Sequence, residues 1–500
     1  MNRKMLALAL TLAAISAAHA SDTALTAVAQ ENGQDRVVTE TLIAPFPSKL
    51  YSHPIVSPDG KRMAWGVQTG IDTLVIVDGK EEKPYDNIIG NLSFSPDSKR
   101  VAYVAKTGQK CLAVVDGKEE KPYDNIGHLS FSPDSKRLIY AAKAGNKWLV
   151  VVDGQAEEPY DQIGVPSFSP DSKRVAYMAA TGNKLFVVVD GKAEKPYDGI
   201  GDIIFSPDSK RVEYAAQTGQ KWLEVVDGKE EKPYDALGKG YSIFSPDSKR
   251  VAYVANAGDK WLVVVDGKKE KPYMGIMHPI FSPDSKRVAY VAKAGDKWLA
   301  VVDGKEGKPY MGIMPPIFSP DSKRVVYAAK AGNKWLVVVD GKEDKSYDNI
   351  GEAPVFSPDS KRLVYVAKAG DKWLLVVDGK EGESYDNWRG PVFSPDSKRV
   401  AYVAKTGQKW FAVVDGKEEK PYDGIGNPYF SPDSKRVVYH ALADEKLFVV
   451  VDGKEGKQYE TIFGVTGKKE VGKLQFDSSD GLHYLAMKEK SIYLVEEKLK

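Results

Sequence analysis

The sequence predicts an all-β protein, a β-propeller of about twelve four-stranded blades, on three observations. The heptapeptide FSPDSKR occurs ten times, and from Phe94 to Phe430 its copies are 37 residues apart seven times, with one spacing of 38 and one of 39. Each period holds short β-rich runs between turn residues and has no helical periodicity. The two central runs are apolar on both faces, so each small sheet needs cover on both sides. Sheets stacked face to face around an axis, with short protected edges, form a propeller.

The first half of one period shows the first two elements in order. PIFS (279–282) is a short apolar strand, and the proline and aspartate of the following PDSK suit the centre of a tight turn. RVAYVAK (287–293) is then a second strand of β-forming residues. AGD (294–296) turns the chain back. The segment therefore predicts a first antiparallel pair.

The second half of the period adds two more strands. KWLAVV (297–302) is apolar on both faces, and Asp303-Gly304 after it is a strong hairpin signal. KEGKPY (305–310) is polar and broken by a proline, which suits a protected outer edge. Each period is thus expected to form a four-stranded antiparallel meander, in which turns one and three share one face of the ring and the AGD turn lies on the other.

The repeat resembles a known family. FSPDSKRVAYVA (281–292) is similar to the WD40-like propeller repeat of TolB-type periplasmic proteins, and the likeness runs from Val56 to Tyr459. The repeats lack the Gly-His and Trp-Asp pairs of true WD40 repeats, as the TolB-type form does. The resemblance implies a propeller whose partners are proteins of the cell envelope.

The two ends of the chain bear on ring closure. A weaker copy, VSPDGKR, begins at Val56, and a degenerate FDSSDG begins at Phe476, which brings the count to about twelve units. The last unit has material for three strands, and the segment 35–51 offers a fourth that would latch the ends together. We therefore favour a single ring over the alternative of two six-bladed rings, although most propellers have four to eight blades.

The N-terminus has the form of a secretory signal, so we divide the chain into a signal peptide (1–20), an N-terminal segment with a possible closing strand (21–51) and the propeller repeats (52–500). Arg3 and Lys4 precede an apolar run that ends in an Ala-His-Ala cleavage site. Cleavage after Ala20 would deliver the protein to the periplasm or the exterior. A net charge of +2, with acids and bases interspersed, argues against nucleic-acid binding, and no membrane span is expected.

One position varies while the rest of the repeat is copied closely. It lies three residues before the phenylalanine, or before Val56, and with its neighbours it forms the set that we call the entry residues. The candidate partner-binding entry residues are His53, Asn91, His128, Asp202, Tyr241, His278, Glu352, Arg389 and Asn427. We expect them to surround the mouth of the central channel and to bind a partner, with unselected drift as the alternative.

No catalytic, metal or cofactor site is predicted. The sequence has no nucleophile elbow, HExxH motif or phosphate-binding glycine loop. His53, His128 and His278 belong to units one, three and seven, too far apart to share a metal ion. We interpret the chain as a secreted or periplasmic, non-enzymatic scaffold for a cell-envelope protein. The alternatives are an enzyme acting on polysaccharide or peptide through Asp202 and Glu352 at the channel mouth, and a structural or surface-display array.

Overall fold

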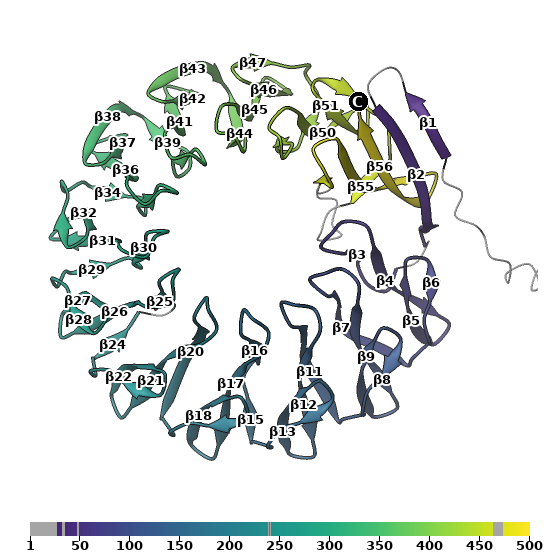
Figure 1. Cartoon of the computed structure of the whole chain (residues 1–500), viewed down its shortest axis with the longest axis vertical. Helices are drawn as coiled ribbons and strands as arrows, with labels where there is room; N and C mark the ends of the chain where they lie inside the picture. Colours follow the sequence, from purple (N-terminus) through teal and green to yellow (C-terminus); the bar gives the residue numbers. More distant parts are fainter. Residues whose placement is uncertain (1–27, 33–35, 48–49, 239, 241, 464–473) are drawn as a thin grey trace, which may run out of the picture.

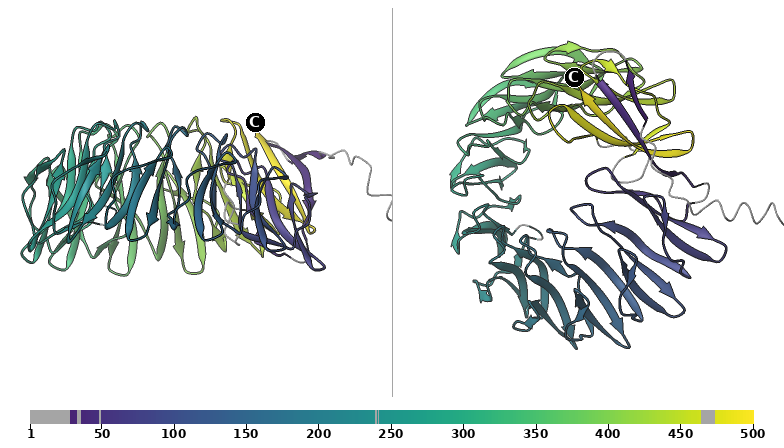
Figure 2. Two further views of the ribbon diagram at one scale, coloured as in Figure 1. Left: turned by 90° about the horizontal axis from the view of Figure 1, so that it is seen from below. Right: turned by 45° about the vertical axis from the view of Figure 1, so that its right-hand side comes forward.

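The twelve repeats form one closed ring around a central hole (Figures 1 and 2). The computed structural model describes residues 28–32, 36–47, 50–238, 240, 242–463 and 474–500, and the regular structure of these residues consists of strands. Twelve sheets are present within this part of the chain. The predicted all-β propeller with about twelve blades in a single ring is therefore confirmed, and the alternative of two rings is excluded. The predicted signal peptide lies outside the described residues.

Blades 1 to 11 follow chain order from β3 to β52, and their strands run from the hole outward. The second strands are β4 Met63–Thr69, β8 Val101–Thr107, β12 Leu138–Ala144, β17 Val175–Thr181, β21 Val212–Thr218, β26 Val251–Ala257, β31 Val288–Ala294, β36 Val325–Ala331, β41 Leu363–Ala369, β45 Val400–Thr406 and β50 Val437–Ala443. The third strands are β5 Asp72–Val77, β9 Lys110–Val115, β13 Lys147–Val152, β18 Lys184–Val189, β22 Lys221–Val226, β27 Lys260–Val265, β32 Lys297–Val302, β37 Lys334–Val339, β42 Lys372–Val377, β46 Lys409–Val414 and β51 Lys446–Val451.

The central strands are buried on both faces, as their apolar pattern predicts. All five leading residues of β31 are buried, and residues from both faces of its blade enter clusters shared with the neighbouring blades. The hairpin to the fourth strand uses positive backbone angles, with φ of 53° at Asp303 and 73° at Gly304. Both central residues of a tight type I′ turn need such angles, and aspartate followed by glycine is a preferred pair there.

The outermost strands are short where the repeat carries proline. They are β6 Lys80–Glu81, β10 Lys118–Glu119, β14 Gln155–Ala156, β19 Lys192–Ala193, β23 Lys229–Glu230, β28 Lys268–Lys269, β33 Lys305–Glu306, β38 Lys342–Tyr347, β43 Lys380–Tyr385, β47 Lys417–Glu418 and β52 Lys454–Glu455. Blades 8 and 9 have Ser346 and Ser384 where most sister repeats have proline, and only there does the strand run for six residues. Proline lacks the N–H that continues a ladder, so it ends the pairing early. Blade 11 has Gln458 at this position, and its outermost strand is also two residues long.

In blades 2 to 11 the regular pairing of the innermost strand is disturbed near its middle, either by a bulge or by a break that divides the strand in two. It is continuous, with a bulge, in β7 Asn87–Phe94, β11 Asn125–Phe131, β20 Gly199–Phe205 and β44 Asn387–Phe393. It is split into β15 Gln162–Ile163 and β16 Ser167–Phe168, β24 Ala236–Leu237 and β25 Ile243–Phe244, β29 Gly275–Ile276 and β30 Ile280–Phe281, β34 Gly312–Ile313 and β35 Ile317–Phe318, β39 Asn349–Ile350 and β40 Val355–Phe356, and β48 Gly424–Ile425 and β49 Tyr429–Phe430, while blade 1 has β3 Ile55–Val56. In blade 7 this strand begins at Gly275 rather than at the expected Pro279.

The twelfth blade joins both ends of the chain. Its strands are β53 Thr461–Phe463, β54 Gln475–Phe476, β55 Gly481–Lys488 and β56 Ser491–Leu499, followed outward by β2 Arg36–Pro45 and β1 Val28–Asn32. The N-terminal β2 is antiparallel to β56 along its whole length, and the buried Arg36 guanidinium lies 2.9 Å from the Glu497 carboxylate. Blade 12 then packs on blade 1 through a cluster that includes Trp65, Phe463 and Leu485.

Candidate functional site

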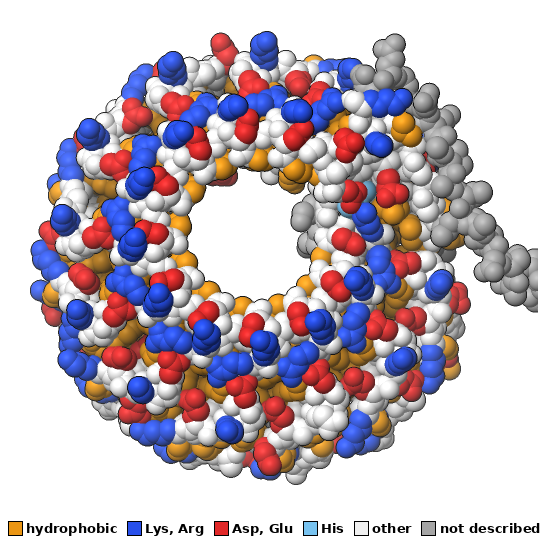
Figure 3. Space-filling view, in the orientation of Figure 1, with side chains coloured by type: hydrophobic (Ala, Val, Ile, Leu, Met, Phe, Trp, Pro, Cys, Tyr) orange, Lys and Arg blue, Asp and Glu red, His pale blue; other side chains and the backbone are white. Residues whose placement is uncertain are grey.

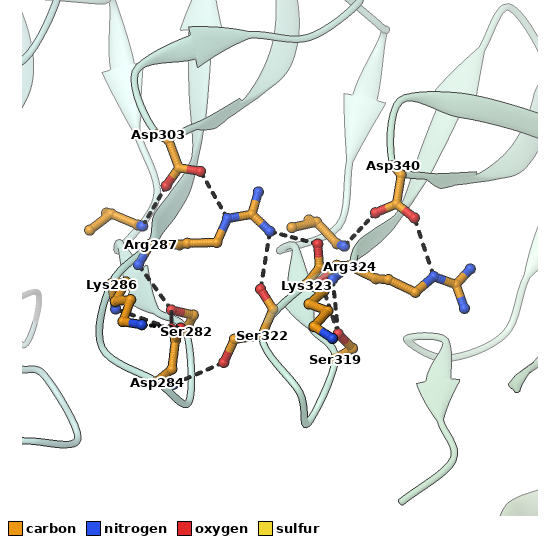
Figure 4. Close-up of polar contacts among 12 residues, drawn as sticks. Ser282, Asp284, Lys286, Arg287, Asp303, Ser319, Ser322, Lys323, Arg324 and Asp340 are labelled. Atoms are coloured by element: carbon orange, nitrogen blue, oxygen red, sulfur yellow. Dashed lines mark hydrogen bonds and ion pairs between the residues drawn. The ribbon is translucent and has the colours of Figure 1, made fainter. Parts of the chain in front are cut away.

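The repeated SPDSK loop is a hydrogen-bonded turn that reaches the next blade (Figure 4). The Ser282 hydroxyl donates to Asp284 Oδ1 at 2.6 Å, the Lys286 amide donates to the same oxygen at 3.2 Å, and the Arg287 amide donates to Ser282 Oγ. The Asp284 amide donates to Ser322 Oγ of the following blade at 2.8 Å. The hydrogen bonds from Ser282 and Lys286 hold the pKa of Asp284 below its usual value.

The arginine that ends the loop fastens the two blades together. Arg287 Nε donates to Asp303 of its own blade at 2.9 Å, and Nη1 donates to the carbonyl oxygens of Ser322 and Lys323 of the next blade at 3.1 and 2.9 Å. Its guanidinium also lies over the Phe318 ring at 5.2 Å. The equivalent arginine contacts recur at ten interfaces between blades, which we call seams, through Arg62, Arg100, Arg137, Arg174, Arg211, Arg250, Arg287, Arg324, Arg362 and Arg399. Nine of these arginines belong to copies of FSPDSKR and Arg62 belongs to the weaker copy VSPDGKR, so the repeated motif has one structural use at each of these seams.

The described entry residues lie in the innermost strands or in the breaks of these strands. Asn91, His128, Asp202 and Arg389 lie in β7, β11, β20 and β44, whereas His278, Glu352 and Asn427 lie between the two pieces of a split strand and His53 precedes β3. His128 occupies the bulge of β11 and Asp202 the bulge of β20. The side chains of the described entry residues, which are His53, Asn91, His128, Asp202, His278, Glu352, Arg389 and Asn427, are exposed. Tyr241 lies outside the described residues. Figure 3 shows acidic and basic side chains interspersed on the face of the ring and hydrophobic side chains at the rim of the hole.

Two entry residues, Arg389 and Asn427, lie at the seam between blades 10 and 11. The Arg389 guanidinium lies 4.3 Å from the centre of the Trp410 ring and donates to the Ile425 carbonyl oxygen at 3.3 Å, and Asn427 lies against Gly390. Behind them, burial and the charge of Arg389 lower the pKa of His440 to about 4. This corner combines a cation, an amide and an aromatic face.

The other entry residues stay separate. Asp202 and Glu352 belong to blades 5 and 9, with three blades between them, and the histidines His53, His128 and His278 belong to blades 1, 3 and 7. Among the described residues, no group of three or more His, Cys, Asp or Glu side chains is placed to hold a metal ion. The described part of the chain likewise has no helix with the length and hydropathy of a membrane span.

Sequence reasoning missed two buried carboxyl groups at the seam between blades 5 and 6. Glu213 on β21 and Glu224 on β22 are 0 and 1% exposed, and the Ser242 hydroxyl donates to Glu213 Oε1 at 2.9 Å. Burial raises the pKa of Glu213 to about 7, and burial together with the charge of Glu213 raises that of Glu224 to about 8. The signal was available, because VEYAA and KWLEVV carry glutamate where sister repeats carry Ala, Val, Ile or Leu.

A cavity of about 840 Å³ lies beside this pair, between blades 4, 5 and 6. Apolar side chains form much of its wall, and the polar side chains that line it are Ser167, Asp202, Glu224, Ser242 and Tyr253. Its volume is within the range of small-molecule sites, which are mostly apolar with a few placed polar groups.

Comparisons with known proteins give likeness at the level of the fold. No family model and no curated protein matches the chain. Among solved structures, the propeller domain of the Trilobed protease from Pyrococcus furiosus is 15% identical over 52% of this chain and 94% of that one, with a TM-score of 0.26. TolB from Acinetobacter baumannii is 15% identical over 49% of this chain and 78% of that one, with a TM-score of 0.23. Dihydro-heme d1 dehydrogenase NirN is 13% identical over 61% and 77%, with a TM-score of 0.28. The fold itself is established by the twelve blades of the described residues, which form a single-ring β-propeller.

Proposed function

We propose that this chain is an exported, non-enzymatic propeller that serves as a scaffold for a protein partner in the cell envelope. The observation that carries the proposal is a contrast within each blade. The loops and arginines of the seams repeat almost unchanged, whereas the exposed entry residues on the innermost strands differ from blade to blade. Variable side chains on a rigid framework are the usual form of a binding surface.

The chemistry of the entry residues favours a protein over a uniform polymer. The described entry residues carry imidazole, amide, carboxylate and guanidinium groups that differ from blade to blade, and Arg389 lies on Trp410. A polyanion would call for a stripe of cations, and a repetitive polysaccharide would call for a repeated subsite. A protein surface presents mixed groups and is matched by mixed groups.

The exported location and the TolB-like role are supported by the signal-like residues 1–20 and by the repeat resemblance. We expect the full-length chain expressed in a Gram-negative bacterium to be recovered from the periplasm or the medium with Ser21 at its N-terminus. N-terminal sequencing of the purified protein tests this. Recovery of the uncut chain from the cytoplasm would contradict it.

The binding surface is tested by a matched pair of triple variants. One changes His53, Glu352 and Asn427 to alanine on the channel wall, and the other changes Lys136, Lys210 and Lys361 to alanine on the repeated loops. Each set lies on three different blades and is exposed, and the lysine side chains are 81–82% exposed. We expect an envelope protein that the unchanged ring retains to be lost from the channel variant and kept by the loop variant.

The other outcomes of this experiment would support another binding surface or one of the alternative functions. A partner kept by the channel variant and lost from the loop variant would move the binding surface to the repeated face. Turnover of a polysaccharide or peptide that is lost in Asp202→Asn or Glu352→Gln would favour the enzyme. If all three proteins retain nothing and turn over nothing, the chain is a structural or display array.

A further inference from the structure

The glutamate pair at the seam between blades 5 and 6 interrupts a position that is otherwise apolar around the ring. Glu213 is replaced by Ala252 in blade 6 and Ala289 in blade 7, and Glu224 by Val263 and Ala300. Ala252 and Val263 are fully buried in the core between blades 6 and 7. Blade 5 alone among blades 1 to 11 carries glutamate at both positions.

The two carboxyl groups lie on the same face of the blade 5 sheet. In the pairing of β21 with β22, Glu213 is opposite Val226 and Glu224 is opposite Ala215. Residues two apart on a strand share a face, so the two glutamates are diagonal neighbours. Val226 on this face packs with Tyr253 of blade 6, so the pair faces the seam.

Several buried polar atoms at this seam have no hydrogen-bond partner within the described part of the chain. Glu213 Oε2, Glu224 Oε1 and the Tyr253 hydroxyl are buried without a hydrogen bond among the described residues. The Ser242 hydroxyl donates to Glu213 Oε1, and Ser242 also lowers the pKa of Glu224. Buried polar atoms of this kind are costly unless something pairs with them.

Two of the residues with unpaired atoms, Glu224 and Tyr253, line the cavity, whereas Glu213 does not line it and is the diagonal neighbour of Glu224. Ser242 also lines the cavity, and Trp222 with Met178 belongs to its largely apolar wall. Asp202, which is exposed on the channel side of β20, also lines it, so the cavity is open to solvent there. A ligand that reaches the pair from the channel therefore passes a third carboxylate.

This combination selects one class of ligand. A bare calcium or magnesium ion needs six or more oxygen ligands, and the mostly apolar wall does not supply them. An organic cation uses both parts of the site, because its ammonium group pairs with carboxylate and its apolar body packs on aromatic faces. We propose that the seam between blades 5 and 6 is a binding site for a small organic ammonium ion, with Glu224 and Glu213 as its counter-charge.

The test compares two probes of one shape. The ammonium probe is 2-phenylethylammonium and the neutral probe is 2-phenylethanol, each titrated by calorimetry into the full mature ring at pH 8. We expect the ammonium ion to bind at least tenfold more tightly than the alcohol. Equal binding of the two probes, or binding of neither, would overturn the proposal.

Three variants separate recognition from folding. Glu224→Gln keeps the shape and removes the charge, and the double variant Glu213→Ala with Glu224→Val installs residues found in sister blades. Both should fold, as circular dichroism would show, and lose the preference for the ammonium ion. Glu419→Gln changes a seam glutamate that already accepts a hydrogen bond from Tyr439, at 2.5 Å, and should bind the probe unchanged. A preference that survives in either Glu224 variant, or is lost equally in Glu419→Gln, would overturn the assignment.

Discussion

The seam between blades 5 and 6 and the seam between blades 6 and 7 have the same arginine contacts, but different side chains are buried in them. Arg211 at the first and Arg250 at the second make the same contacts, to an aspartate of their own blade at 2.9 Å and to two carbonyl oxygens of the next blade at 2.9–3.2 Å. The interior of the second seam is apolar, whereas the first holds Glu213 and Glu224.

The difference shows that the contacts of the loop and its arginine, which join neighbouring blades, do not depend on the side chains buried between the blades. The loop that reaches across a seam is bonded by its own residues and by the backbone of the next loop, so it does not depend on which side chains fill the seam. Blade 5 therefore keeps its place in the ring while two core positions carry carboxyl groups. Four predictions test this comparison, in order of expected effect.

The largest effect is expected when the glutamate pair is copied into the second seam. Ala252→Glu with Val263→Glu would place two carboxyl groups at positions that are fully buried. An uncompensated buried charge costs about 3–5 kcal/mol, so we expect the urea midpoint to fall sharply or the ring not to fold. Ala252→Val is the control, because sister blades carry Val326 and Val364 there. A stable double variant would mean that any seam accepts carboxyl groups.

The reverse exchange should stabilise the ring in a pH-dependent way. The carboxyl pKa values of about 7 and 8 exceed the usual value of 4.5, so the folded form holds protons that the unfolded chain releases. The contribution of this pair to the stability of the unchanged ring is thus fully present below about pH 4.5 and is lost as the pH rises toward 8, by about 1.4 kcal/mol for each pH unit and group. The charged groups that act on the pair are Arg211, Asp227 and Glu231.

Urea midpoints of the unchanged ring and of the Glu213→Ala, Glu224→Val variant, measured from pH 4.5 to 9, check this. The advantage of the variant should be smallest at pH 4.5, grow steadily up to about pH 8 and then stay level. A difference that does not change with pH would contradict the assignment of the raised pKa values to these two groups.

Removing the arginine contacts at one seam should lower the free energy of unfolding less than burying two carboxyl groups does. Arg250→Ala removes an ion pair, two hydrogen bonds and a contact with the Phe281 ring, which we expect to cost roughly 1.5–3 kcal/mol. Arg211→Ala should cost more, because the charge of Arg211 also lowers the pKa of Glu213. Urea denaturation of both variants at pH 8 compares them, and an equal loss would show that the arginine does not act on the pair.

The smallest effect is expected for the lysines of the repeated loop. The Lys286 side chain is 82% exposed, and its ammonium lies 3.9 Å from the Asp284 carboxylate. Lys286→Ala should change the free energy of unfolding by less than about 0.5 kcal/mol, because exposed pairs contribute little and the backbone amide that holds Asp284 remains. Lys249→Ala in blade 6 is the matched case, and a loss above 1 kcal/mol in either would contradict this account.

The strands and turns of each blade could be predicted from the sequence, but the start of the innermost strand and the contacts between distant residues could not. The turn residues and the two-sided apolar runs predicted the blade, and residues 35–51 offered a spare strand. The innermost strand was misjudged at its start, because Gly275 and Ile276 pair with β31 although glycine and methionine around them show no strand pattern. The glutamate pair was overlooked because its residues are eleven apart and become neighbours only when β21 pairs with β22.

The sequence by itself determined the period, the four strands of each blade and the faces on which its turns lie, because these depend on backbone preferences and on burial patterns within about 37 residues. The tertiary structure decided what depends on distant contacts. Pairing of β2 with β56 closes one ring of twelve blades, and the stacking of blades 5 and 6 brings Ser242 to Glu213. The repeat sequence determines how each blade packs on the next. The number of blades in the ring is decided only when the two ends of the chain pair.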